Sequence, residues 1–175
     1  MNLSVKPLLF LIGIFITYDV RAQSLYDLDV QNGTRVYKLN TQIGKYINKL
    51  EFLSNDEGGI KTYRIVEPNS FIVEPKSFQN QKPLKVFLRY YRGLLYQITL
   101  YFYDNHGMDY KNISSAFETL YNSPTDFKTT DIGNFYSEWQ SNKVQLSIES
   151  NKADHTFSVE YQSQIIERKI LLNRN

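Results

Sequence analysis

The sequence predicts an α+β fold in which an antiparallel β-sheet carries two short amphipathic helices packed on one face. Three observations lead to this prediction. Apolar and polar residues alternate along several runs in the second half of the chain, and short polar turns join these runs. Two other stretches repeat apolar residues at helical spacing, each over about three turns. Helices of that length are marginal on their own, so both must pack on the sheet.

The first 22 residues are typical of a secretory signal peptide. Lys6 is followed by an apolar run over residues 7–17, and small side chains at Val20 and Ala22 suit a signal peptidase. The run is shorter than the ~20 apolar residues that a membrane-spanning helix needs. We therefore expect cleavage after Ala22 and one globular domain over residues 23–175, without a transmembrane segment. An uncleaved membrane anchor is the alternative.

The composition excludes several classes of protein. The chain has no cysteine, which rules out disulfide-stapled modules, thiolate zinc sites and a lipid anchor on cysteine. Removing residues 1–22 lowers the formal net charge from +2 to +1, too little to attract nucleic acid or an anionic membrane. An exported chain without cysteine fits a bacterium better than a eukaryotic secretory route. We therefore expect a periplasmic or secreted bacterial protein.

The first half of the domain contains the weaker signals. Residues 41–50 repeat apolar side chains at helical spacing, namely Ile43, Tyr46, Ile47 and Leu50. Residues 36–39 before them and residues 60–66 after them are strand-like. Residues 67–83 hold three of the five prolines and are predicted to form an extended loop or an edge strand.

Residues 86–91 and 94–103 are predicted to form the central β-hairpin. A three-residue loop, Tyr91-Arg92-Gly93, places Gly93 at the left-handed position that such loops favour. Arg89 and Gln97 then point outward. The inner pairs on this register are Tyr90 with Leu94, Leu88 with Tyr96, and Val86 with Ile98. A two-residue loop would instead turn Arg89 to the inner face, so we favour the longer loop.

The second half predicts one more helix and three strands. The helix covers residues 110–121, with Asp109 as its N-cap and Asn122-Ser123-Pro124 as its stop. A short strand covers residues 135–140, and a hairpin joins the alternating runs at 144–149 and 157–162. Residues 164–175 either form an amphipathic helix that touches a membrane or, as we expect, pack along the domain or continue as a strand.

The order of elements raises the possibility of an internal duplication. Strand, helix and strand follow one another at residues 36–66 and again, at greater length, at residues 94–163. No match between individual residues supports two such units, so coincidence is the alternative.

Motifs for catalysis, nucleotides and metals are absent. The chain has no nucleophile elbow and no glycine-rich phosphate loop, and His106 and His155 lie too far apart for a zinc motif. Residues 27–33 superficially resemble a calcium loop, but Asn32 stands where the glycine is needed and Lys38 where the glutamate is needed. A polar turn is the expected structure there. We predict neither a cofactor nor a metal ion.

The candidates for acid–base chemistry are weak. His106 and Asp104 lie in the turn between the longest predicted strand and the second helix, where a carboxylate beside an imidazole could move a proton. The same residue types are also what a tight turn uses. Other acids stand in predicted loops, namely Asp56, Glu57, Asp126 and Asp131. A small exported hydrolase using His106 or these loop carboxylates is our alternative function.

The functional hint that we favour is aromatic. Tyr101 and Tyr103 stand two residues apart on the outer face of the long strand, next to Thr99 and Gln97. Together they form a flat amphipathic platform suited to a partner protein or a sugar ring, unless a helix or another strand covers it. We therefore expect a non-enzymatic binding protein outside the cytoplasm, with a protein or carbohydrate partner, no nucleic acid and an oligomeric state that the sequence does not indicate.

Overall fold

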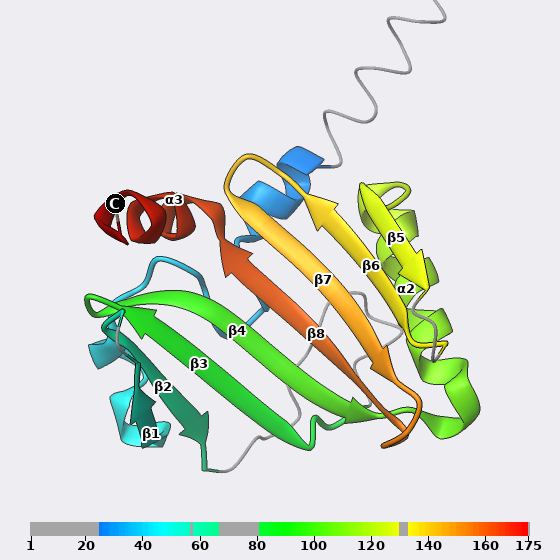
Figure 1. Ribbon diagram of the computed structural model, residues 1–175, viewed down its shortest axis with the longest axis horizontal. Helices are drawn as coiled ribbons and strands as arrows, with labels where there is room; N and C mark the ends of the chain where they lie inside the picture. The colour runs from blue at the N-terminus through cyan, green and yellow to red at the C-terminus, as the bar shows by residue number, and fades with distance from the viewer. Residues whose placement is uncertain (1–24, 57, 67–80, 130–132, 175) are drawn as a thin grey trace, which may run out of the picture.

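The computed structural model describes residues 25–56, 58–66, 81–129 and 133–174. These residues form an eight-stranded antiparallel sheet with the order β1-β2-β3-β4-β8-β7-β6-β5 (Figure 1). The strands are β1 (Leu50–Asn55), β2 (Ile60–Ile65), β3 (Lys85–Tyr91), β4 (Leu94–Tyr103), β5 (Asp126–Thr129), β6 (Phe135–Gln140), β7 (Val144–Asn151) and β8 (Thr156–Ser163). The predicted α+β class is confirmed. The proposed signal peptide and residues 67–80 of the proline-bearing segment lie outside the described residues.

Besides an α-helix over residues 25–31, two α-helices and three 3₁₀ turns accompany the described strands. They are η1 (Ile43–Lys45), η2 (Ile47–Lys49), η4 (Asn105–Gly107), α2 (Met108–Tyr121) and α3 (Gln164–Arg174). Residues 25–31 are also helical, although we expected a polar turn at 27–33. No helix among the described residues is long and apolar enough to cross a membrane.

The helix predicted at residues 41–50 is wrong, because the backbone there is engaged by the β3–β4 hairpin. Ile43 donates its N–H to the carbonyl of Gly93 at 2.9 Å, and Leu95 donates to the carbonyl of Thr41 at 2.9 Å. Gly44, a poor helix former, further weakens a continuous helix. The segment therefore turns twice as η1 and η2. Residues 36–39 form only an isolated bridge, between Lys38 and Gly33, in place of the predicted strand.

The two halves of the sheet have the same order of elements, but not the predicted one. A helical segment precedes the meander β1–β4, and η4 with α2 precedes the meander β5–β8. Strands β4 and β8 are the last strands of the two meanders, and they pair with each other at the centre of the sheet. The unit that recurs is thus a helical segment followed by four strands.

The main core lies on one face of the sheet, which we call the inner face. The helix at 25–31, the segment at 37–46 and α2 cover it, and Trp139 of β6 is fully buried there. Trp139 also donates its indole N–H to the carbonyl of Asn122 at 2.7 Å, which holds the end of α2 against the sheet. The inner-face residues of the four central strands are Val86, Leu88, Tyr90, Leu95, Ile98, Leu100, Phe102, Val144, Leu146, Ile148, Phe157, Val159 and Tyr161.

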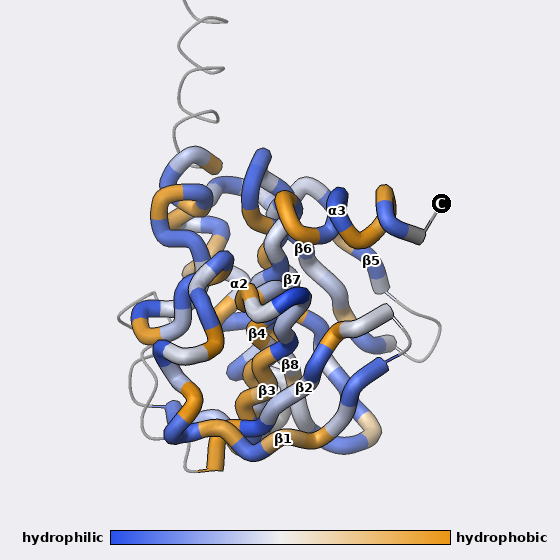
Figure 2. The backbone as a smooth tube through the Cα atoms, turned by 90° about the vertical axis from the view of Figure 1, so that its left-hand side faces the viewer, coloured by the Kyte–Doolittle hydropathy of each residue, from blue (hydrophilic) through white to orange (hydrophobic). Residues whose placement is uncertain are grey.

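The helix α3 lies on the opposite face. The two segments predicted to be helical, residues 41–50 and 110–121, both pack on the inner face, although the first forms 3₁₀ turns. Figure 2 shows α2 and α3 on opposite sides of the strands. Ile166 and Ile170 of α3 are buried against a smaller apolar cluster formed by Ile60, Tyr91 and Tyr96. Residues 164–174 pack along the domain, as we expected for the segment 164–175, and they do so as a helix.

A β-bulge explains how this second cluster arises. The β3–β4 loop has two residues, Arg92 and Gly93, with φ of 49° and 81°, as in a type I′ turn. The register then shifts between Arg89 and Tyr90, so that Tyr96 is an extra residue of β4 and turns to the outer face. The predicted register was therefore wrong. The observed pairs are Tyr90 with Leu95, Leu88 with Ile98, and Val86 with Leu100. Arg89 still faces Gln97 on the outer side, because the bulge compensates for the shorter loop.

The backbone conformation of Gly33 can be tested by substitution. Its φ is +117°, and a Cβ there would lie 2.6 Å from the carbonyl oxygen of Tyr37 and 3.0 Å from Ile98 Cδ1. We expect Gly33→Ala to lower the free energy of unfolding by about 2 kcal/mol or more. Gly44→Ala is the control, since no atom lies within 4 Å of its Cβ position, and it should change stability by less than ~1 kcal/mol. Urea denaturation measures both, and equal effects would contradict the expectation.

Candidate functional site

The outer face of the sheet is lined with polar side chains in register across four strands. Side chains alternate between the two faces of each strand, so residues that pair across strands line up in rows. One row consists of glutamines, a second of Thr and acidic or Ser residues, and a third of two tyrosines with Ser and Glu between them. We call these residues the polar face: Gln97, Gln162, Gln145 and Gln140; Thr99, Glu160, Ser147 and Glu138; Tyr101, Ser158, Glu149 and Tyr136.

Most of this face is turned toward the viewer in Figure 1, with the 25–31 helix and α2 behind the sheet. Of the described helices, α3 is the one that packs on the outer side, over the apolar cluster with Tyr96. Among the described residues, no other helix covers the polar face over β4, β8 and β7.

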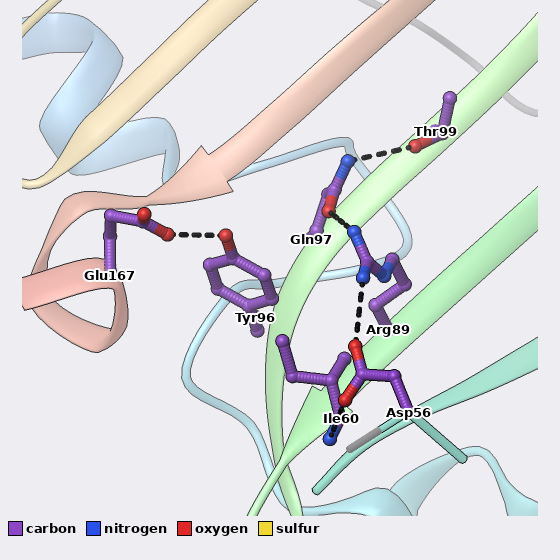
Figure 3. Close-up of polar contacts among 7 residues, drawn as sticks. All are labelled: Asp56, Ile60, Arg89, Tyr96, Gln97, Thr99 and Glu167. Atoms are coloured by element: carbon purple, nitrogen blue, oxygen red, sulfur yellow. Dashed lines mark hydrogen bonds and ion pairs between the residues drawn. The ribbon is translucent and has the colours of Figure 1, made fainter. Parts of the chain in front are cut away.

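Hydrogen bonds fix the side chains at one end of the polar face (Figure 3). Arg89 donates from Nη1 to Gln97 Oε1 at 2.9 Å and pairs through Nη2 with Asp56 Oδ2 at 3.3 Å. The amide of Gln97 donates to Thr99 Oγ1 at 3.5 Å, and the Thr99 hydroxyl donates to Glu160 Oε2 at 3.1 Å. This chain of contacts runs from the β1–β2 loop to β8, so these side chains hold one arrangement.

A second group of contacts attaches α3 to the sheet. The Tyr96 hydroxyl donates to Glu167 of α3, and Gln162 Nε2 donates to Glu167 Oε2 at 3.1 Å. Burial raises the pKa of Tyr96, and the neighbouring Glu167 raises it further. The phenol is therefore a neutral donor at physiological pH, and α3 is held by a hydrogen bond as well as by its apolar side chains.

A hollow opens beside Tyr101. Its volume is about 530 Å³, and its lining includes Lys85, Phe87, Tyr101, Glu149, Asp154 and Ser158. The rings of Phe87 and Tyr101 meet edge to face with centroids 5.7 Å apart, which fixes the orientation of Tyr101. Because Ser158 is small and lies between Tyr101 and Glu149 in register, it leaves the floor of the hollow open.

The electrostatics around the hollow are negative. Burial raises the pKa of Glu160, and Glu149 on the neighbouring strand raises it further, while Gln97, Thr99 and Arg89 act in the opposite direction. Burial also raises the pKa of Tyr101, and Glu160 and Glu149 add to the rise. Neighbouring carboxylates therefore raise the pKa of both groups. No described ion pair involves Glu149 or Glu160.

The structure divides the four predicted platform residues into two pairs. Tyr101 and Tyr103 are exposed, at 38% and 63% of their surface, whereas Gln97 and Thr99 retain only 7% each. All four share the outer face, but Gln97 and Thr99 belong to the hydrogen-bonded layer beneath it. Tyr101 borders the hollow, and Tyr103 lies at the next outward position along β4.

The structure gives Asp104 a capping role that we had assigned to Asp109. Asp104 is 8% exposed, and its Oδ1 accepts the backbone N–H groups of Asp109 at 3.1 Å and Tyr110 at 3.4 Å. Asp109 instead accepts hydrogen bonds from the backbone N–H and the side-chain amide of Asn105. The cap moved because η4 precedes α2 and brings the earlier carboxylate to the first turn. His106 lies in η4, and its side chain is outside the described part of the structure.

The loop carboxylates of the alternative function do not gather in one place. Asp56 pairs with Arg89 and accepts the N–H of Ile60 at 2.8 Å, and Asp126 pairs with Lys128. Glu57 and Asp131 lie outside the described residues. In the described part of the chain, no group of three His, Cys, Asp or Glu side chains could hold a metal ion.

Sequence reasoning missed Glu149, Glu160 and Ser158, although their outward positions were visible in the alternation of residues 144–162. Their place beside Tyr101 depends on the pairing of β4 with β8, whose partners are about 60 residues apart, as for Thr99 and Glu160. The outward polar positions of that predicted hairpin were the available signal. Nothing local indicated that they adjoin the tyrosines.

Residues 35–171 match the family model of the TP0088 domain. No curated protein and no solved structure matches the chain. The matched segment contains the whole polar face and the residues of the hollow.

The raised pKa of Glu160 leads to a pH-dependent stability. Because its pKa is higher in the folded than in the unfolded protein, its contribution to the free energy of unfolding falls as the pH rises through the folded-state pKa. We expect Glu160→Gln to raise the Tm at pH 7 and to leave it unchanged at about pH 3.5, where both states are largely protonated. Thermal unfolding followed by circular dichroism checks this, with the exposed Glu118→Gln on α2 as control. A lower Tm for Glu160→Gln at pH 7 would contradict the expectation.

Proposed function

The chain belongs to the TP0088 domain family, and from this premise we propose that it is a non-enzymatic binding protein whose binding surface is the polar face with the hollow beside Tyr101. We further propose that it works outside the cytoplasm, as a periplasmic or secreted protein. The first proposal is supported by the geometry of the sheet. The second is supported by the pattern of residues 1–22.

The observation that carries the proposal is an open, ordered hollow on a polar sheet face. Phe87 fixes the ring of Tyr101, and the contacts from Asp56 to Glu160 fix the side chains beside it. Binding surfaces whose groups are already ordered lose less conformational entropy when a partner docks. An aromatic ring with one exposed side, surrounded by hydrogen-bonding groups, is a common composition for such a surface.

No observation favours the hydrolase. General acid–base catalysis needs two groups that converge on a substrate, and the described carboxylates of the proposed catalytic set are engaged elsewhere. Asp104 caps α2, Asp56 pairs with Arg89, and Asp126 pairs with Lys128. We therefore carry forward only the binding function.

The binding surface can be tested by capture from an envelope extract of the source organism. We expect a partner that the wild-type protein enriches to be recovered about tenfold less well by the double variant Tyr101→Ala with Tyr103→Ala, because both exposed rings of the platform are removed. Tyr26→Ala is the matched control, since this ring is 58% exposed on the 25–31 helix. Quantitative mass spectrometry compares the recoveries. Undiminished recovery of every partner by the double variant would overturn the proposed surface.

Export is tested separately. When the full chain is expressed in a bacterium, we expect the protein to leave the cytoplasm and its N-terminus to be Gln23, because Val20 and Ala22 suit signal peptidase. Cell fractionation followed by mass spectrometry of the intact protein measures both. Replacing Ala22 by a bulky residue, Ala22→Phe, should leave the uncleaved form. A cytoplasmic protein that starts at Met1 would contradict the assignment.

A further inference from the structure

We propose that the hollow beside Tyr101 binds a guanidinium group, supplied by an arginine side chain of a partner protein. This inference rests on the proposed binding function and specifies the chemistry that its central site accepts. It is argued from the charges around the hollow, from the position of the aromatic ring and from the spacing of the acceptors.

The first argument is charge complementarity. Glu149 and Asp154 line the hollow, and Glu160 stands on the strand next to Glu149. Among the described lining residues Lys85 is the one cationic side chain, and it makes no described ion pair with these acids. Lys85 is exposed, so its flexible stem can turn the ammonium into solvent. The hollow therefore carries an excess of negative charge that a cation from outside would balance.

The second argument is the aromatic wall. Tyr101 keeps 38% of its surface exposed while Phe87 contacts it edge to face. A cation over a tyrosine ring is attracted by the negative face of the π-system, and a guanidinium can stack flat on that face. A group stacked on Tyr101 would stand above Ser158, which is too small to obstruct it.

The third argument is the spacing of the acceptors. Glu149 pairs directly with Ser158, and Glu160 lies two residues further along β8, so the two carboxylates are diagonal neighbours, with Cα atoms about 7–8 Å apart in such a geometry. One guanidinium has five N–H donors in a planar fork and can reach two acceptors at once, which a compact ammonium does less well. This favours arginine over lysine.

The buried state of Glu160 agrees with this assignment. Burial and Glu149 hold its pKa above the ordinary value. A cation bound between the two carboxylates would lower the pKa of Glu160 and so act against both effects. The Thr99 hydroxyl occupies one oxygen of Glu160 at 3.1 Å and keeps the carboxylate oriented.

The inference is tested with a small probe that contains the guanidinium alone. Acetyl-arginine-amide is titrated into the purified protein while amide chemical shifts are recorded by NMR, and acetyl-citrulline-amide serves as the uncharged isostere. We expect arginine to shift the amides of Tyr101, Glu149 and Ser158 and to bind at least about fivefold more tightly than citrulline. Acetyl-lysine-amide, with a free side-chain amine, should bind more weakly than arginine.

Three substitutions test in which direction each charge changes arginine binding. Glu149→Gln should weaken arginine binding about fivefold, because it removes one exposed carboxylate without disturbing the core. Lys85→Gln should strengthen it, because a like charge is removed. Glu118→Gln, an exposed acid on α2, should change nothing. Unchanged melting temperatures for all three show that folding is intact.

The following results would contradict the proposed guanidinium site. Equal binding of arginine and citrulline, or equal loss in Glu149→Gln and Glu118→Gln, would overturn the guanidinium site. Lysine binding as tight as arginine would overturn the choice of guanidinium. If these results occur while partner capture still depends on Tyr101 and Tyr103, the proposed binding surface stands and only its ligand chemistry is refuted.

Discussion

The pairing of β4 with β8 is the contact on which the rest of the structure depends. It joins the two four-stranded meanders into one sheet, with Gln97 opposite Gln162 at one end and Tyr103 opposite Thr156 at the other. On the inner side the pair brings Phe102 onto Phe157, whose rings stack with centroids 5.1 Å apart. On the outer side the same register places Thr99 against Glu160 and Tyr101 against Ser158. The core and the polar face therefore form together, because one set of ladder hydrogen bonds fixes both.

The two faces of the sheet differ because of what covers them. The inner face is apolar and is closed by the N-terminal helical segments and α2, as expected for a sheet that buries one side. The outer face is polar except where the bulge at Tyr96 turns an aromatic side chain outward, and α3 packs there. Glu167 of α3 accepts a hydrogen bond from the Tyr96 hydroxyl, so this buried phenol has a hydrogen-bond partner where the helix packs. No other described helix packs on the remaining outer surface, and this is where the hollow lies.

A site built on strands inherits the rigidity of the sheet. Arg89, Gln97 and Thr99 are held by mutual hydrogen bonds and support the residues at the surface, and Gln97 and Thr99 are themselves largely buried. The exposed groups, Tyr101 and Glu149, stand on either side of Ser158. This division between a supporting layer and a contact layer suits recognition of a partner, since the surface has little order left to acquire on binding. For the binding function that we propose, Glu149 and Glu160 would favour a partner of positive charge.

The sequence by itself determined the elements whose pattern is strong and local. Period-two alternation predicted β4, β6, β7 and β8 and placed Tyr101 and Tyr103 on an outer face, and helical spacing predicted α2. Only the tertiary structure decided the bulge at Tyr96, the turns η1 and η2, the capping role of Asp104 and the side of the sheet that α3 covers. The physical reason is that periodicity encodes which side of its own strand or helix a residue occupies. It does not encode which distant strand becomes the neighbour, and the hollow is made by neighbours about 60 residues apart, such as Thr99 and Glu160.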